Sequence, residues 1–231
     1  MKYMGSKARI AKDILPIILK DRKHDQWYVE PFAGGANVIQ YVSGNRIVPD
    51  SNRILIECLK LIRDNPDQLP KETTEQMYKS IKNSEIDVSD GLKGYYAFAL
   101  SYGGKQWGGW CRDSEGKRNY VQEALNNALK QSKLLDKCLF ECREYDKIEL
   151  QPNSIVYCDP PYAGTTKYKE AFDHVKFWNW VREQAKNGHQ VFVSEYNAPN
   201  DFKCVWEKEI VSSLTKNTGS KKGTERLFVY E

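Results

Sequence analysis

The chain has 231 residues, of which 40% are hydrophobic and 12% aromatic, and its formal net charge is +4. Such a chain can build the core of one large domain, or of a domain with an inserted subdomain, and is not a disordered polymer. No apolar run approaches the roughly 20 residues of a membrane span, and the N-terminal residues lack the apolar core of a signal peptide. We therefore expect a folded, cytoplasmic protein.

The first part of the chain alternates between helices and strands. The apolar spacing predicts an amphipathic helix at residues 7–15, which Pro16 bends or restarts. A strand at 27–32, a glycine turn at 33–37, a second strand at 46–50 and a second helix at 53–65 follow. The second strand ends in an acid, Asp50. This order is typical of one half of a doubly wound parallel sheet.

The pattern changes between residues 70 and 150. Helical stretches at 71–83, 92–100 and 121–135 surround a segment, 101–119, whose glycines and two tryptophans fit no regular element. We interpret residues 69–137 as an inserted, mainly helical subdomain with a long exposed loop. Residues 1–68 and 138–231 would then form the main domain together.

The α/β alternation returns after the insert. Strands are expected at 138–145, 154–162, 190–196, 204–211 and 226–231, with a helix at 173–188. The last two strands have no helix between them, so a C-terminal antiparallel hairpin is expected. The predicted fold class is therefore α/β, with a doubly wound sheet.

A glycine turn at residues 33–37 directly follows the first predicted strand. Glycines there let the backbone approach a ligand at the carboxyl edge of the sheet. The turn is not the Gly-x-x-x-x-Gly-Lys pattern of a phosphate-binding loop. Asp50 is placed to accept hydrogen bonds from ribose hydroxyls, or else to cap the helix that begins near Arg53.

The segment Asp159-Pro160-Pro161-Tyr162 follows another predicted strand. Its prolines remove two backbone donors and favour extended geometry at Asp159 and Pro160. A carboxylate and carbonyl groups then face a ligand that is all donor, such as an exocyclic amino group, and Tyr162 can stack on a flat ring. The alternative is a rigid turn with a buried tyrosine.

These segments, in this order, resemble the Dam-type, D12 class of N6-adenine-specific DNA methyltransferases. The likeness covers nearly the whole chain: residues 2–7 resemble the N-terminal cofactor motif, 30–38 the glycine motif, 50–52 the ribose-binding motif and 154–162 the catalytic segment. The resemblance implies a Rossmann-like, S-adenosylmethionine-dependent methyltransferase sheet in the main domain and target recognition by the insert. It also implies a bacterial or phage source.

The family pattern implies which residues contact the cofactor. They are Tyr3, Lys7, Phe32, Ala33, Gly34, Gly35, Asp50 and Asp159. One position departs from the pattern, because Ala36 stands where the family usually has the last glycine of Phe-x-Gly-x-Gly. The sequence leaves open whether this alanine weakens the affinity for the cofactor, since a methyl group there is no obvious block.

The resemblance implies direct methyl transfer, with Asp159, Pro160, Pro161 and Tyr162 as catalytic residues. Asp159 and the Pro160 carbonyl would accept the two N6 hydrogens, so that the nitrogen lone pair faces the methyl group. Because N6 lies inside the duplex, the adenine must leave the stack, and Tyr162 would stack on it. No metal is needed, and the six cysteines, without a Cys-x-x-Cys pair, indicate neither a zinc site nor disulfides.

The positive charge lies in two segments. Residues 101–135 and 203–226 each carry a net +3, which leaves −2 for the rest of the chain. The first contains Trp107-Gly108-Gly109-Trp110-Cys111-Arg112, which resembles the family's recognition loop. We predict double-stranded DNA as the partner and the following DNA contacts: Arg112 on a guanine edge, Trp107 as a wedge in the stack, and Lys105, Lys117, Arg118, Lys221 and Lys222 on phosphates.

Several alternatives remain open from the sequence. The tryptophans could plug the subdomain, Arg112 could form a surface ion pair, and the loop before the last strand could be a plain hairpin connection. Cytosine-N4 methylation is a rival function, since the same two acceptors suit that amine. A methyltransferase-derived DNA-binding protein without activity is another, favoured only by Ala36. Nothing indicates an obligate protein partner or a membrane.

Overall fold

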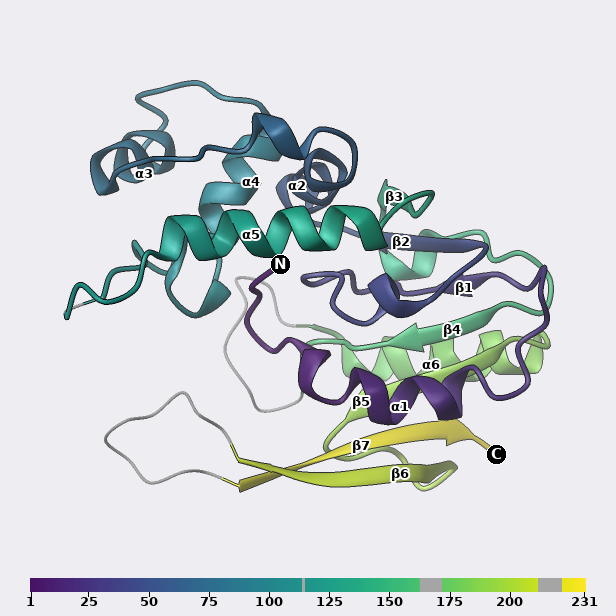
Figure 1. Cartoon of the computed structure of the whole chain (residues 1–231). Coiled ribbons are helices and arrows are strands. Elements are labelled where there is room, and N and C mark those ends of the chain that lie inside the picture. Colours follow the sequence, from purple (N-terminus) through teal and green to yellow (C-terminus); the bar gives the residue numbers. More distant parts are fainter. Residues whose placement is uncertain (114, 163–171, 212–221) are drawn as a thin grey trace.

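The computed structural model describes residues 1–231 except 114, 163–171 and 212–221 (Figure 1). The strands are β1 (Tyr28–Val29), β2 (Arg46–Asp50), β3 (Leu139–Cys142), β4 (Ile155–Cys158), β5 (Gln190–Glu195), β6 (Phe202–Val211) and β7 (Lys222–Tyr230). The α-helices are α1 (Ala11–Ile18), α2 (Arg53–Asp64), α3 (Glu75–Lys82), α4 (Asp90–Phe98), α5 (Tyr120–Leu134) and α6 (His174–Lys186). Short 3-10 helices include η1 (Lys7–Arg9), η4 (Tyr102–Gly104) and η5 (Tyr145–Lys147).

The strands form one sheet in the order β3-β2-β1-β4-β5-β7-β6. β1 to β5 are parallel, whereas β7 runs antiparallel to both β5 and β6. Tyr28 of β1 pairs with Arg46 on one side and with Ile155 on the other. The strand order therefore reverses between β1 and β4, which creates a ligand-binding switch point at their carboxyl ends. The predicted doubly wound sheet with a C-terminal antiparallel hairpin is confirmed.

Both faces of the central strands are buried. In β4, Ile155 and Tyr157 join the core formed with α1, α2, α4 and α5, whereas Val156 and Cys158 join the core beneath α6. Figure 1 shows α1 and α5 in front of the sheet and α6 behind it. This two-sided burial explains why the β4 sequence is continuously apolar rather than alternating.

The helices of the 69–137 segment share a core with the sheet. Tyr78 of α3, Tyr95 of α4 and Leu125 of α5 belong to the same buried cluster as Leu55 of α2. α4 lies directly on α2 because Gly94 has no side chain, and a Cβ there would collide with the Ile54 carbonyl oxygen. The limits of the inserted subdomain, 69 and 137, stay a prediction.

Some element boundaries differ from the prediction at prolines. Pro16 lies inside α1 and does not divide it, because a proline costs one helical hydrogen bond while the buried side chains around it hold the helix in place. The ladder of β1 continues to Glu30, whose N–H donates to Ile47 (3.1 Å), and stops before Pro31. β4 likewise ends at Cys158, because Pro160 and Pro161 cannot donate to a neighbouring strand.

Candidate active site

The carboxylate of Asp50 lies at the carboxyl end of β2 and faces the glycine turn after β1. Its oxygens accept hydrogen bonds from the backbone N–H groups of Ala33 (3.1 Å) and Asn52 (2.8 Å). Asn52 caps α2, since its side chain accepts the Leu55 N–H. The alternative in which Asp50 is the helix cap is therefore wrong. Burial raises the pKa of Asp50 to about 6, although hydrogen bonds from these N–H groups oppose the shift.

The N-terminal segment crosses the glycine turn. Gly34 adopts a φ of +47°, and a Cβ on it would lie 3.4 Å from the Tyr3 ring. A Cβ on Gly35 would lie 2.7 Å from the Met1 carbonyl oxygen and 2.9 Å from the Cβ of Tyr3. Gly35 is therefore required by the close approach of two backbones, and Tyr3 is held beside the turn.

Ala36 also adopts a left-handed conformation, with a φ of +53°. Its methyl group is fully buried and belongs to the hydrophobic core. The side chain of Gln131, on α5, donates hydrogen bonds to the carbonyl oxygens of Gly35 (2.8 Å) and Ala36 (3.3 Å). The departure from the family pattern thus adds a methyl group to the core and not to the exposed side of the turn.

Phe32 holds the other side of the turn. Its half-buried ring stacks on Tyr145 at a centroid distance of 5.5 Å and meets Phe172 and Phe177 edge to face. These rings belong to the core beneath α6. The turn is therefore fixed from both faces of the sheet.

Asp159 follows β4 and forms an ion pair with Lys7, whose Nζ lies 2.9 Å from Oδ1. The Lys7 side chain is 8% exposed and that of Asp159 is 21% exposed. Burial raises the pKa of Asp159 although Lys7 lowers it. Burial alone would lower the pKa of Lys7, but the Asp159 and Glu225 carboxylates outweigh it and raise that pKa. Lys7 therefore remains a cation.

Tyr162 is held by two residues that the sequence did not single out. Its hydroxyl donates to Oε2 of Glu225 (2.7 Å), and its ring meets that of Tyr196 edge to face at 4.6 Å. Nζ of Lys7 lies 4.4 Å from the centroid of the Tyr162 ring. The sequence presents Glu225 only as one acid in a basic segment, and no pattern connects it with residue 162.

Pro160 is buried and Pro161 is half-buried. Neither has an N–H, so the backbone after Asp159 offers acceptors and no donor over these two residues. Asp159, Tyr162, Lys7 and the glycine turn come together at the carboxyl end of β1 and β4. This is the edge that the sequence predicted for the ligand.

The segment 101–112 has more structure than the predicted irregular loop. Gly103 sits in η4, and Ser101 pairs with Trp110 in an antiparallel bridge. The Trp107 ring is half-buried and meets the Tyr78 ring edge to face at 5.5 Å. Lys105 is exposed.

Arg112 is 69% exposed and forms an ion pair with Glu75 (2.7 Å). This is the surface pair that the sequence left as the alternative to a DNA contact. Lys117 and Arg118 are similarly paired, with Glu115 (2.7 Å) and Glu123 (2.6 Å).

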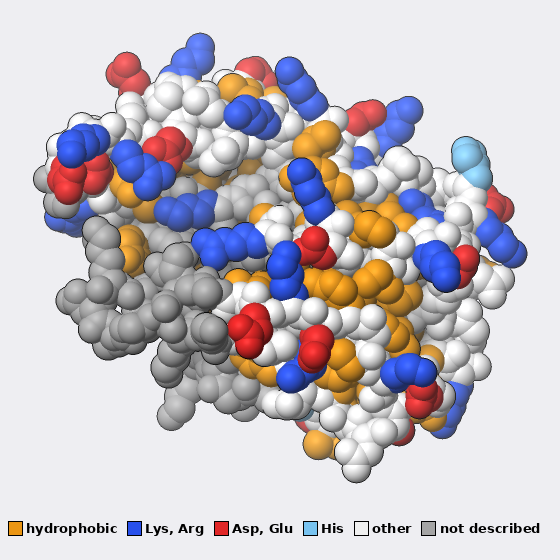
Figure 2. All heavy atoms as spheres, turned by 60° about the horizontal axis from the view of Figure 1, so that its bottom comes forward, with side chains coloured by type: hydrophobic (Ala, Val, Ile, Leu, Met, Phe, Trp, Pro, Cys, Tyr) orange, Lys and Arg blue, Asp and Glu red, His pale blue; other side chains and the backbone are white. Residues whose placement is uncertain are grey.

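Figure 2 shows basic and acidic side chains interspersed on one face of the molecule. Lys221 lies outside the described residues, as does most of the predicted basic loop. Lys222 begins β7. The roles of all these residues on DNA stay predictions.

The 101–112 segment contacts the cofactor-motif residues directly. The Met4 N–H donates to the Gly104 carbonyl (3.1 Å), and a Cβ on Gly104 would lie 2.6 Å from the Cα of Tyr3. The side chain of Asn52 donates to Oε1 of Gln106 (3.1 Å). The sequence does not indicate this connection, because these residues are about 50 to 100 positions apart in the chain.

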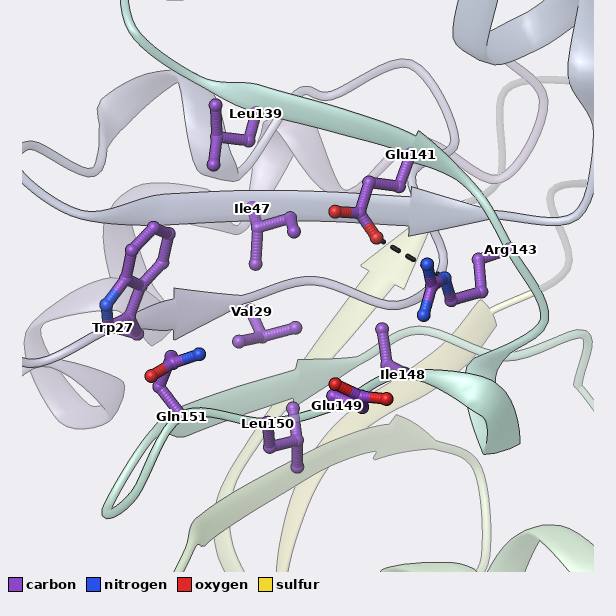
Figure 3. A pocket seen from close by; sticks show the side chains of 10 residues that line it. All are labelled: Trp27, Val29, Ile47, Leu139, Glu141, Arg143, Ile148, Glu149, Leu150 and Gln151. Atoms are coloured by element: carbon purple, nitrogen blue, oxygen red, sulfur yellow. Dashed lines mark ion pairs between the residues drawn. The ribbon is translucent and has the colours of Figure 1, made fainter.

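A separate pocket of about 270 Å³ lies on the face of β1, β2 and β3 (Figure 3). Trp27, Ile47 and Leu139 line it, with an ion pair between Glu141 and Arg143 (3.4 Å). None of the predicted site residues contributes to its lining. Over the described residues, no cluster of His, Cys, Asp or Glu suits a metal ion, and no helix is long and apolar enough to cross a membrane.

The sequence matches the D12 class N6 adenine-specific DNA methyltransferase family over residues 3–90 and 112–218. The chain belongs to this family. This membership confirms the predicted family and the predicted enzyme class, an adenine-specific DNA methyltransferase. It also agrees with the predicted fold class, a methyltransferase sheet. The gap in the match, residues 91–111, includes most of the segment around Trp107.

Three relatives are similar over most of this chain. The Type II methyltransferase M.FokI of Planomicrobium okeanokoites is 24% identical over 79% of the chain, but the chain spans only 32% of that protein. The Type II methyltransferase M1.LlaDCHI of Lactococcus lactis is 23% identical, covering 86% of the chain and 81% of the relative. The Retron Ec67 DNA adenine methylase of Escherichia coli is 26% identical, covering 84% and 75%.

Proposed function

We propose that this chain methylates N6 of an adenine flipped out of double-stranded DNA, with S-adenosylmethionine as the methyl donor. The observation that carries the proposal is the position of Asp159, paired with Lys7 and beside the Tyr162 ring, at the sheet edge that also holds Asp50 and the glycine turn. The target adenine, held by Asp159, and the methyl donor, held by Asp50, would then meet at one edge of the sheet. The Type II relatives support a place in a restriction-modification system.

The residues at this edge fit the cofactor. The Asp50 carboxylate, fixed by two N–H groups, is suited to accept hydrogen bonds from ribose hydroxyls. When bound, S-adenosylmethionine supplies an electrophilic methyl group on a positively charged sulfur. We propose that it is held by Tyr3, Lys7, Phe32, Ala33, Gly34, Gly35, Asp50 and Asp159. The methyl group of Ala36 is buried in the core.

The catalytic residues would make N6 nucleophilic. Asp159 and the Pro160 carbonyl accept the two N6 hydrogens, which directs the lone pair to the methyl group. The nitrogen gains the methyl group and gives up one proton, for which the Asp159 carboxylate is an adjacent acceptor. Pro161 keeps the backbone free of a competing donor, and Tyr162 stacks on the base, which offsets about 1–3 kcal/mol of the cost of flipping.

The recognition segment would bind DNA with side chains that are ion-paired in the free protein. We propose that Arg112 exchanges Glu75 for a guanine edge, that Trp107 wedges into the stack, and that Lys105, Lys117, Arg118, Lys221 and Lys222 contact phosphates. These residues lie in or beside the proposed subdomain, 69–137, and in the segment that leads into β7.

The rival functions are less well supported. Cytosine-N4 methylation would use the same acceptors, and the family match favours adenine. The one feature in favour of an inactive DNA-binding protein is Ala36, and its side chain is buried in the core, which weakens that argument.

The test is to incubate the protein with duplex DNA and methyl-labelled cofactor, and to analyse the nucleosides. N6-methyladenine is the expected product. N4-methylcytosine, or no product, would contradict the proposal. Asp159→Ala should fold, bind DNA and lose at least about 100-fold in rate, because an acceptor of the N6 hydrogens is gone. Asp21→Ala, at an exposed position, is the control.

A further inference from the structure

Glu225 lies on β7 and is 15% exposed, between the catalytic segment and the N-terminal motif. Its Oε2 accepts the Tyr162 hydroxyl at 2.7 Å and lies 3.7 Å from Nζ of Lys7. It belongs to none of the segments through which the family was recognised in the sequence. Both of its partners are residues of the proposed reaction.

Lys7 is shared between two carboxylates. Its ammonium group pairs with Asp159 at 2.9 Å, donates to the Gly5 carbonyl at 3.3 Å and faces Glu225. The separation of 3.7 Å from Glu225 is too long for a hydrogen bond, and it joins the two groups as an ion pair. The charge of Glu225 therefore acts on Nζ in addition to the direct contact with Asp159.

Glu225 also determines how Tyr162 presents its ring. Lys7 lies over one face of the ring, and the Tyr196 ring packs against Tyr162 in a T-shaped contact. The hydroxyl is hydrogen-bonded to Glu225, which restrains the position of the outer end of the ring. We expect a base to stack on the face that Lys7 does not cover.

The charge of Glu225 changes the net charge of the site. Lys7 and Asp159 alone would form a neutral pair, whereas the three side chains together carry one net negative charge. Methyl transfer leaves positive charge on N6, and a preorganised negative environment stabilises that charge most in the transition state. Such an effect appears in kcat more than in KM.

We propose that Glu225 is a positioning residue for methyl transfer, which orients Tyr162 and Lys7 and keeps the combined charge of Lys7, Asp159 and Glu225 negative. This inference rests on the proposed function. The other titratable groups that face Asp159 are Glu30, Tyr157, Cys158, Tyr162 and Tyr196. The negative charge of Glu225 raises the pKa of Asp159, opposite to the effect of Lys7.

The test compares Glu225→Gln, which keeps an acceptor for the Tyr162 hydroxyl but loses the charge, with Glu225→Asp, which keeps the charge. In single-turnover methylation we expect Glu225→Gln to lose at least about tenfold in rate with little change in cofactor affinity, and Glu225→Asp to recover part of the loss. The acid limb of the rate profile should move to lower pH, because removing a like charge lowers the pKa of Asp159.

The matched control is Glu207→Gln, on the neighbouring strand, whose carboxylate is 63% exposed and pairs with Arg226. It should leave both the rate and the pH profile unchanged. A Glu225→Gln protein with the wild-type rate and profile would show that Glu225 has only a structural role.

A second measurement does not depend on activity. The pKa of the Asp159 carboxyl group is followed by carbon-13 NMR in the wild-type protein and in Glu225→Gln, and we expect a lower value in the variant. An unchanged value overturns the inference. If the wild-type protein transfers no methyl group at all, the proposed function fails, and the NMR comparison still decides whether Glu225 acts on Asp159.

Discussion

Two aspartates at the carboxyl ends of the parallel strands β2 and β4, which flank β1, have different partners. Asp50 is bound by backbone N–H groups, whereas Asp159 is bound by the ammonium group of Lys7. Burial raises the pKa of both carboxyl groups. For Asp50 the raised pKa is about 6, so the carboxyl group ionises within the pH range in which the protein can be studied.

We predict that the affinity for S-adenosylmethionine is constant above pH 7 and weakens as the pH falls through about 6, the pKa of Asp50. Protonation removes the carboxylate that would accept the ribose hydroxyls, so the loss approaches about tenfold per pH unit below this value. Isothermal titration calorimetry between pH 5 and about pH 8 measures the effect. Asp50→Asn should bind weakly without this dependence, and a flat wild-type profile would refute the assignment.

The stability of two short elements, β1 and α4, comes from the elements packed beside them. β1 has two residues and is held by β2 and β4, while α4 is held by its contact with α2. The α4 contact requires Gly94 and joins the proposed recognition subdomain to the sheet through one continuous core.

Gly94→Ala should therefore destabilise the whole protein. A Cβ at this position would collide with the Ile54 carbonyl and lie 2.7 Å from the Cβ of Cys58, so α4 must move away from α2. We expect a loss of at least about 2 kcal/mol in the free energy of unfolding, measured in urea as a single transition. Gly103→Ala, which has open space and a φ of +65°, should lose about 1 kcal/mol from backbone strain alone. Equal losses in the two variants would contradict the packing argument.

At the scale of the whole molecule, three of the basic side chains predicted to contact DNA are already paired with acids in the structure. Arg112, Lys117 and Arg118 are each paired with a glutamate. Binding to DNA would exchange these pairs for phosphates or base edges. The net charge of +4 therefore gives only a weak long-range attraction, and affinity should depend on particular side chains.

Lys105→Ala should weaken binding to all duplex sequences alike. Loss of one phosphate contact should reduce the slope of log affinity against log salt by about 1, measured by fluorescence anisotropy at several KCl concentrations. Lys203→Ala removes a lysine near the start of β6 that pairs with Glu231 (3.1 Å), and should leave the slope unchanged. If Lys105→Ala changes preference between sequences and not the slope, the lysine does not act on phosphates.

Local patterns were sufficient for most of the elements, whereas the roles of the site residues stay predictions. The glycine turn, Asp50 and Asp159 each follow a predicted strand, and parallel strands bring their carboxyl ends to one edge. The predictions were less accurate at Pro16 and in the 101–119 segment, because buried neighbours held a helix and a bridge there that local propensity does not favour.

The sequence by itself determined the family, the α/β alternation and the motif residues, because strand periodicity, proline geometry and glycine turns act over a few neighbouring positions. Only the tertiary structure decided that Lys7 pairs with Asp159, that Glu225 holds Tyr162, and that Gln131 and Gln106 meet the cofactor motifs. These contacts join residues 54 to 152 positions apart in the chain. They arise because the sheet order places β7 beside β5 and packs α5 on the glycine turn, and no local pattern encodes that arrangement.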